Sequence, residues 1–225
     1  MGAKLFERAT VMVAALPSVA AGMLPGVFRA VLAEHPEMQL RILDGTTREV
    51  IEYVRSGAAE RAIAEAANAD PRVRGQLLYE EPVLAVLPAG HPLAERASLT
   101  WNGLARQPFI AFTPSSSVRR LAGLSFEQAG VRPTHVIETR EVSTAAGMIS
   151  AGLGVGALPR LVLPLMAFGR LVTRPLNDPG TVRKLAAYAP RTPVLPAASA
   201  YFLHRVLHTI AAAEDDGNER EGQGE

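Results

Sequence analysis

The chain has 225 residues, of which 48% are hydrophobic and 20% are charged, as in a globular protein with one large domain or two small ones. It contains no cysteine, which excludes disulfides, thiolate metal sites and a cysteine nucleophile. Residues 1–10 lack the apolar core of a signal peptide, and no apolar run approaches the roughly 20 residues of a membrane helix. We therefore expect a cytoplasmic protein that does not contact a membrane.

The net charge of +1 hides an uneven distribution. Residues 214–225 carry a net charge of −5 and are rich in glycine, which is typical of a disordered acidic tail. The rest of the chain carries +6, but these positive charges are dispersed, whereas nucleic-acid binding needs a clustered basic patch. The charge pattern therefore predicts no direct DNA binding by this chain.

The first third of the chain alternates strand patterns with helix patterns, which predicts a parallel sheet with right-handed crossovers. Ser18 follows an apolar run and a proline, so it is the candidate N-cap of the first helix. The expected elements are a strand at 11–15, a helix from Pro17-Ser18 that ends at His35-Pro36, a strand at 38–42, a helix from about 47 that Gly57 closes, and a strand near Ala62-Ile63.

A second alternation follows the apolar strand pattern at 83–87 and the turn at 90–93. The expected elements are a strand at 109–112, a polar turn at 113–117, a helix at 118–129, a strand at 135–137, a helix at 142–151, strands at 155–158, 171–172 and 184–188, and a last helix from about 196 to 213. Two successive α/β units on a chain of this length predict two lobes.

Polar residues follow several of the predicted strands. Ligands of open α/β sheets bind beyond the carboxyl ends of the strands, which predicts one cleft bordered by residues 16–18, 45–47, 64–66 and 113–117. The candidate effector-binding residues are Ser18, Thr46, Thr47, Glu65, Thr113, Ser115, Ser116, Ser117 and Ser143.

Each candidate also has a purely structural interpretation. Ser18 can act as a plain N-cap, although exposed N–H groups at a helix N-terminus also attract anions, so the two roles can coexist. Of Thr46 and Thr47, one can cap the helix while the other offers its hydroxyl to a ligand. Ser143 begins a later helix and is a weaker candidate. Arg119 or Arg120 either adds positive charge to the 113–117 turn or lies on a solvated face.

Other motifs do not predict catalysis, a cofactor or a metal site. Gly152, Gly154 and Gly156 follow a helix and precede a strand, the reverse of the dinucleotide fingerprint, so close backbone packing is the better interpretation. His204 and His208 are four residues apart, but the zincin glutamate and a third ligand are missing, which favours surface histidines. The chain also shows no nucleophile elbow, kinase motif set or carboxylate dyad.

Three motifs occur in a characteristic order: Ala14-Ala15-Leu16-Pro17-Ser18, Gly90-His91-Pro92-Leu93 and Ala151-Gly152-Leu153-Gly154-Val155-Gly156-Ala157-Leu158-Pro159. Together they resemble the effector-binding domain of LysR-type transcriptional regulators, over about residues 11–210. The resemblance implies an α/β fold of the two-lobe type 2 periplasmic-binding-protein-like class, with a ligand cleft between the lobes. It implies a lobe I of residues 11–84 plus 178–213, a lobe II of residues 85–177, and an N-terminal remnant or linker at 1–10.

The resemblance also implies a function and partners. The domain would sense a small-molecule effector and signal by lobe closure and dimer rearrangement. The expected partners are the effector, a second copy in a homodimer and a full-length LysR-type relative. A winged helix-turn-helix does not fit in the first ten residues. A stand-alone solute-binding protein, or an enzyme that acts in the interlobe cleft, is the alternative.

The chain departs from the family pattern around its third strand. Glu60-Arg61 precede the Ala62-Ile63 pair, where the family usually carries an acid and then an apolar residue. Arg61 at this apolar position is expected to loosen the strand or to re-aim the loop after it. Glu65, if it faces the cleft, disfavours an anionic ligand.

Overall fold

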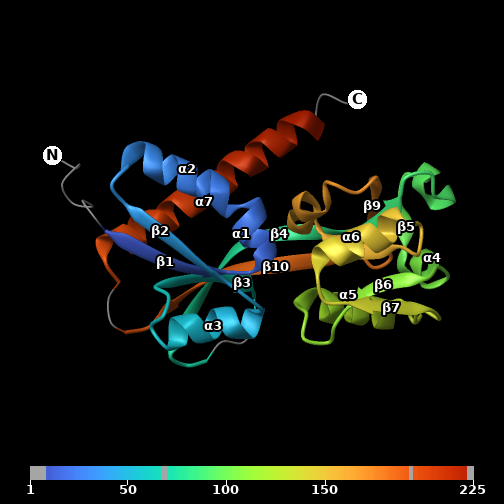
Figure 1. The fold of residues 1–225 in the computed structure, drawn as a ribbon, viewed down its shortest axis with the longest axis horizontal. Coiled ribbons are helices and arrows are strands. Elements are labelled where there is room, and N and C mark those ends of the chain that lie inside the picture. Colours follow the sequence, from blue (N-terminus) through green and yellow to red (C-terminus); the bar gives the residue numbers. More distant parts are fainter. Residues whose placement is uncertain (1–8, 67–69, 193–194, 222–225) are drawn as a thin grey trace. The chain divides into compact units, whose positions relative to one another are not determined.

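The computed structural model describes residues 9–66, 70–192 and 195–221, which form two compact units (Figure 1). Unit 1 comprises Met1–Tyr79 and Leu185–Glu225, and unit 2 comprises Glu80–Lys184. The expected boundaries at 84/85 and 177/178 differ from these, because residues 80–84 and 178–184 belong to unit 2. Each change of unit occurs inside a continuous strand, β4 (Val73–Pro88) or β10 (Val182–Pro190), so no turn in the sequence marks it.

Unit 1 is built on the strands β2 (Gln39–Asp44), β1 (Thr10–Ala15) and β3 (Arg61–Glu65), followed by β10. β1 is parallel to both of its neighbours, and Ala15 lies opposite Asp44 on one side and Ile63 on the other. β10 runs antiparallel to β3. The carboxyl ends of three parallel strands therefore meet at one edge of the sheet, as the alternation of elements predicts.

Helices cover both faces of this sheet (Figure 1). α2 (Leu24–Glu34) and α7 (Ala197–Glu221) pack together on one face, and α3 (Thr47–Arg55) lies on the other. The rings of Phe28 and Phe202 meet edge to face with centroids 5.9 Å apart. The Tyr201 hydroxyl donates to Glu34 Oε2 at 2.7 Å, so apolar and polar contacts both hold α7 against α2.

The helix expected from Pro17 to the His35-Pro36 exit consists of two helices, α1 (Pro17–Gly22) and α2, which meet at Met23. Pro25 in the first turn of α2 has no N–H to donate to the Ala21 carbonyl, so one hydrogen-bonded helix does not run through this position. The N-cap of α1 is Leu16, with Pro17 in the first turn. The expectation that Ser18 is the N-cap is therefore wrong, since Ser18 lies inside the helix.

The structure of the acidic tail, residues 214–225, differs from the predicted disorder. α7 continues to Glu221, so residues 214–221 are helical rather than disordered, while residues 222–225 lie outside the described ranges. Extending a nucleated helix by one residue costs little, and glutamate and arginine have good helix propensity. Of the predicted N-terminal remnant, residues 1–8 also lie outside the described ranges, and Thr10 begins β1.

Arg61 does not loosen β3. It pairs in regular parallel register with Val13 of β1, and its side chain is buried, with a residue exposure of 8%. Its Nε donates to Ser199 Oγ at 3.0 Å, and burial lowers the pKa of the Arg61 guanidinium below its ordinary value. The charged side chain at this apolar position therefore links β3 to α7.

Unit 2 contains the strand order β4-β9-β5, with β8 on the other side of β4, and a separate parallel pair of β6 and β7. The rings of Trp101 and Phe109 each meet Phe126 edge to face in its core. Its elements are η2 (Pro92–Glu95), β5 (Leu99–Thr100), α4 (Trp101–Ala105), β6 (Phe109–Phe112), α5 (Ser117–Gln128), β7 (Val136–Thr139), α6 (Val142–Ser150), β8 (Gly156–Pro159), η3 (Arg160–Met166) and β9 (Leu171–Asn177).

The glycine-rich segment of unit 2 is a packing motif, as predicted. Gly152 ends α6 with a φ of 77°, a conformation that glycine adopts without strain. A Cβ on Gly154 would lie 2.5 Å from the carbonyl oxygen of Pro108, so the two backbones can approach only because Gly154 has no side chain. None of the helices in the described ranges is long and apolar enough to cross a membrane.

Candidate functional site

The carboxyl-end edge of the unit 1 sheet gathers four of the predicted site residues. The Leu16 N–H donates to the Ile63 carbonyl at 3.1 Å, and the Gly45 N–H donates to the Ala15 carbonyl at 3.2 Å. These bonds hold the ends of β1, β2 and β3 together. Glu65 is the last residue of β3, and the segments that follow β1 and β2 carry Ser18, Thr46 and Thr47.

Thr46 is the N-cap of α3. Its Oγ1 accepts from the Glu49 N–H at 3.4 Å and donates to Glu49 Oε2 at 2.7 Å, while the Thr46 N–H donates to the same carboxylate oxygen at 2.8 Å. This reciprocal pair is a capping box, which satisfies N–H groups that the first helical turn leaves without partners. Both hydrogen-bonding functions of the Thr46 hydroxyl are thus used within the protein, and its main role is structural.

Thr47 begins α3, directly after the cap. Its Oγ1 is buried and has no hydrogen-bond partner among the described residues. A buried hydroxyl without a partner is unfavourable, and a bound ligand that hydrogen-bonds to it removes that penalty. The prediction allowed either Thr46 or Thr47 to cap the helix; in the structure Thr46 caps it, and Thr47 is the first residue of α3.

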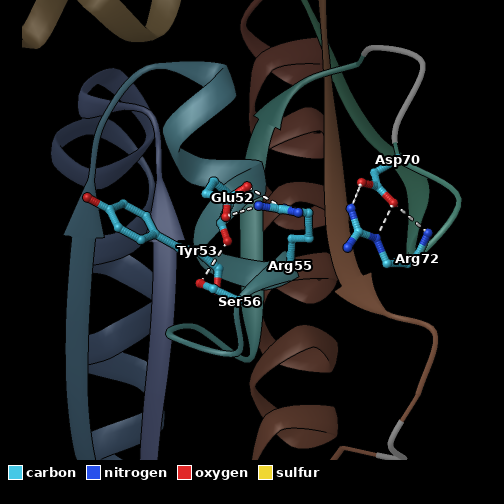
Figure 2. A network of polar contacts seen from close by, with 6 residues as sticks. All are labelled: Glu52, Tyr53, Arg55, Ser56, Asp70 and Arg72. Carbon is cyan, nitrogen blue, oxygen red and sulfur yellow. Dashed lines mark hydrogen bonds and ion pairs between the residues drawn. The ribbon is translucent and has the colours of Figure 1, made fainter.

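The other end of α3 is held by a separate polar network (Figure 2). Arg55 pairs with Glu52, one turn earlier in the helix, and the Ser56 hydroxyl donates to the Glu52 carbonyl at 2.9 Å. Hydrogen bonds from the side chain and the backbone N–H of Arg72 lower the pKa of Asp70 below its ordinary value. Surface pairs of this kind contribute little stability. The contacts of this network lie at the end of α3 and just before β4.

Ser18 and Glu65 are buried polar residues in the same unit, with exposures of 5% and 6%. Ser18 lies in the first turn of α1, and Glu65 ends β3. The Glu65 backbone carbonyl accepts from the Tyr188 hydroxyl at 3.0 Å, which ties the end of β3 to β10. The buried Glu65 side chain places a carboxyl group at the carboxyl end of β3.

The remaining predicted residues lie in unit 2, after the parallel strands β6 and β7, where Phe112 is opposite Thr139. The Thr113 N–H donates to the Thr139 carbonyl at 3.1 Å, and the Thr113 and Ser115 hydroxyls are 3.3 Å apart. Ser116 is the N-cap of α5, since its Oγ accepts from the Val118 N–H at 3.2 Å. Ser117 begins α5, and Ser143 is an exposed residue in the first turn of α6.

The predicted residues thus form two sets, one in each unit, at the carboxyl ends of parallel strands. The cavity between β6 and the start of α5 is only about 10 Å³, near the limit for one water molecule. A hollow of about 540 Å³ elsewhere in unit 2 contains none of the predicted residues. No cluster of three metal-ligating side chains occurs in the described ranges, and His204 and His208 are exposed on α7.

The chain matches a protein family and curated relatives along most of its length. The model of the LysR substrate binding domain matches residues 6–211. The transcriptional dual regulator GltC of Bacillus subtilis is 26% identical over 209 residues, which is 92% of this chain and 70% of GltC. The chain spans only about half the length of several other curated relatives that it matches.

Solved structures share the fold. The effector-binding domain of QuiR in complex with shikimate is 18% identical with a TM-score of 0.79, and the match covers 89% of this chain and 96% of that domain. The BenM effector-binding domain with its effector benzoate is 22% identical with a TM-score of 0.79, and the match covers 92% of this chain and 94% of that domain. These matches confirm the predicted α/β two-lobe fold of the periplasmic-binding-protein-like class. The chain therefore belongs to the LysR substrate-binding domain family, the effector-binding domains of LysR-type transcriptional regulators.

Proposed function

We propose that this domain senses a small organic effector through the polar groups at the strand ends of unit 1, and that Thr47 contributes a direct hydrogen bond. The observation that carries the proposal is the buried Thr47 Oγ1 without a hydrogen-bond partner in the described chain, beside the capped N-terminus of α3. Helix N-termini favour polar and anionic ligand atoms. Ser18 contributes a second hydroxyl in the same unit. The hydroxyls of Thr113, Ser115 and Ser117 in unit 2 are proposed as a further set of contacts, with Ser143 as a weaker candidate.

The chemistry of the effector is inferred from two features. The related domains of QuiR and BenM have been solved with shikimate and benzoate, both small organic carboxylic acids. In this chain Glu65 adds a buried carboxyl group to the unit 1 strand ends. We therefore propose an effector that presents neutral hydrogen-bonding groups to unit 1, and we expect Glu65→Gln to raise the affinity for simple carboxylates.

The experiment begins with a thermal-shift screen of a metabolite library, because a ligand that binds only the folded state raises the melting temperature. For a compound that binds, Thr47→Val removes the hydroxyl and keeps the side-chain shape. We expect an affinity loss of about 0.5–1.5 kcal/mol with no loss of stability, because the lost hydroxyl had no partner within the described chain. Thr10→Val, at the exposed start of β1, is the matched control. Unchanged affinity in Thr47→Val, Ser18→Ala and Ser115→Ala together contradicts the proposal.

The domain is proposed to act by binding alone, as part of a transcriptional regulator. We expect a bound effector to be recovered unchanged after long incubation with the protein, which mass spectrometry of the mixture can measure. We also expect no selective retention of promoter fragments by this chain at physiological salt. A homodimer is the proposed assembly, with a mixed dimer with a full-length relative as a second one, and sedimentation equilibrium of the purified chain tests the first. Turnover of the effector contradicts the sensor role.

A further inference from the structure

A hollow of about 540 Å³ lies in unit 2 at the carboxyl ends of β5 and β9. These strands are parallel, with Leu99 opposite Leu176 and Thr100 opposite Asn177. Loops after parallel strand ends are the usual ligand-binding positions of α/β sheets, and the hollow is an open depression in which Thr100, Asn102, Gln128 and Asp178 are exposed. The hollow borders the C-terminal end of α5, whereas the proposed effector contacts lie at its N-terminal end. A helix of 12 residues separates the two by about 18 Å.

The walls of the hollow are fixed by buried contacts. The indole Nε1 of Trp101, which is fully buried in α4, donates to the Pro179 carbonyl at 3.0 Å. The hydroxyls of Ser125 in α5 and Thr181 are both buried and lie 2.8 Å apart. The loop at 178–181 is therefore attached to both helices that flank the hollow, α4 and α5.

Asp178 is held in a rare backbone conformation at the edge of this hollow. Among the residues that the structure describes, it is the one non-glycine residue with a positive φ, at 51°. Such conformations persist where surrounding contacts enforce them, and they occur often at ligand sites. Trp101 Nε1 and Thr181 Oγ1 both donate to the carbonyl of Pro179, the residue after Asp178, at 3.0 and 3.5 Å.

The polar groups around the hollow are mainly hydrogen-bond acceptors. Asp178 supplies a carboxylate, and Asn102 and Gln128 supply side-chain amides whose oxygens can accept. Gln128 and Ala129 also mark the C-terminal end of α5, where the helix dipole is negative. The described lining residues include no lysine, arginine or histidine: they are Thr100, Asn102, Gln128, Ala129, Asp178 and Pro179. A ligand that carries a positive charge and several N–H donors matches this surface.

We propose that the hollow is a second ligand site, which binds a small organic cation through a charged hydrogen bond between an ammonium group and the Asp178 carboxylate. The side chains of Asn102 and Gln128 accept further donors from the same ligand. This site is independent of the proposed effector contacts, since it shares no residue with them.

The test uses the full chain labelled with ¹⁵N, and the probe is putrescine, with 1,4-butanediol as its neutral counterpart of equal length. The chain has a single tryptophan, so the indole N–H resonance of Trp101 reports on the hollow without ambiguity. We expect putrescine to shift this resonance and the amides of residues 178–181 saturably, with a Kd in the millimolar range. We expect butanediol to cause no saturable shift. Added salt should weaken putrescine binding, because an exposed ion pair is screened.

Asp178→Asn removes the charge and retains a residue type that tolerates positive φ. We expect it to weaken putrescine about tenfold, as for the loss of a hydrogen bond to a charged group. Glu37→Gln, on an exposed turn of unit 1, removes the same charge and should leave affinity unchanged. If Asp178→Asn does not fold, Gln128→Lys is the alternative test. Its ammonium group adds a positive charge to the hollow and should abolish the binding of putrescine. The proposal is overturned by the absence of a saturable shift, by equal binding of butanediol, or by unchanged affinity in the folded variants.

Discussion

Glu81 and Arg183 form an ion pair in which the two side chains are 0% and 2% exposed. Arg183 Nε donates to Glu81 Oε1 at 2.7 Å, and the other carboxylate oxygen accepts from the Leu161 N–H at 2.6 Å. The pair joins β4 to β10 in unit 2, close to the positions where the chain passes between the units. On the exposed side, Lys184 Nζ donates to Glu80 Oε1 at 2.7 Å.

Removing one partner of the buried pair should be strongly destabilising. Arg183→Met leaves the Glu81 carboxylate buried without its counter-ion, and we expect a loss of about 3–5 kcal/mol in the free energy of unfolding. Denaturant titration measures this loss. Glu80→Gln breaks the neighbouring exposed pair and should change stability by less than about 1 kcal/mol. If Arg183→Met and Glu80→Gln lower the free energy of unfolding equally, burial does not make the Glu81–Arg183 pair more important for stability than the exposed pair.

The double variant Glu81→Leu with Arg183→Met should recover much of that loss. Replacing both members of a buried ion pair by apolar side chains is often nearly neutral. Recovery should remain incomplete here, because the Leu161 N–H loses its acceptor, at a cost of about 1–3 kcal/mol. A double-mutant cycle from denaturant unfolding gives the coupling energy. A double variant that is less stable than Arg183→Met alone would contradict this expectation.

Two alanine substitutions at glycines should have opposite effects. In Gly154→Ala the new Cβ meets the Pro108 carbonyl oxygen at 2.5 Å, so the backbone must shift, and we expect a loss of about 1–3 kcal/mol. In Gly147→Ala the Cβ meets nothing within 4 Å, and alanine favours the helix α6 by about 0.5–1 kcal/mol. Thermal unfolding of both variants tests the contrast, which fails if they shift the melting temperature in the same direction.

Thr46→Ala should destabilise the protein by about 1 kcal/mol, because the capping box of α3 loses its hydroxyl. Urea unfolding checks the magnitude. Ser143→Ala, an exposed position at the start of α6 where Ser143 is not the N-cap, should change stability by at most about 0.5 kcal/mol. If Thr46→Ala is as mild as Ser143→Ala, then the capping box contributes no measurable stability.

Glu60 should make stability depend on pH. Burial raises the pKa of the Glu60 carboxyl above its ordinary value of 4.5, and this outweighs the hydrogen bond from Ser199 and the charge of Arg61. Oε2 is buried and has no hydrogen-bond partner among the described residues. The folded state therefore favours the protonated form, and this contribution is fully present below pH 4.5 and is lost as the pH rises through the raised pKa.

Glu60→Gln tests this dependence, because it keeps the shape and removes the titration. We expect the variant to gain stability relative to the parent chain as the pH rises from about 4 towards neutrality. Below the ordinary pKa the difference in unfolding free energy between the two proteins should change little with pH. Chemical denaturation at a series of pH values gives the difference. Ser143→Ala, which changes an exposed residue that does not titrate, should show no such trend. A variant that becomes less stable with rising pH would reverse the sign and contradict the raised pKa.

The sequence alone determined the elements whose signals are local. The apolar run at 11–15 and the positions of α3, α5, β6 and α6 follow from periodicity and end signals, because a helix or a buried strand needs only its own residues to show the pattern. The packing role of Gly154 was predicted from its place after a helix and before a strand, the reverse of the dinucleotide fingerprint. β5 and α4 were missed, since elements of two and five residues are too short to show a period.

Only the tertiary structure decided which polar residues meet. Nothing local indicates that Arg61 reaches Ser199, that Glu81 pairs with Arg183, or that Asp178 borders the same hollow as Gln128. The Thr46-x-x-Glu49 spacing at the start of α3 is a local capping-box signature that favours Thr46 as the cap, whereas only the fold shows that the Thr47 hydroxyl is buried. These contacts depend on how distant segments pack, because a buried polar group takes whichever partner the fold brings within hydrogen-bond reach.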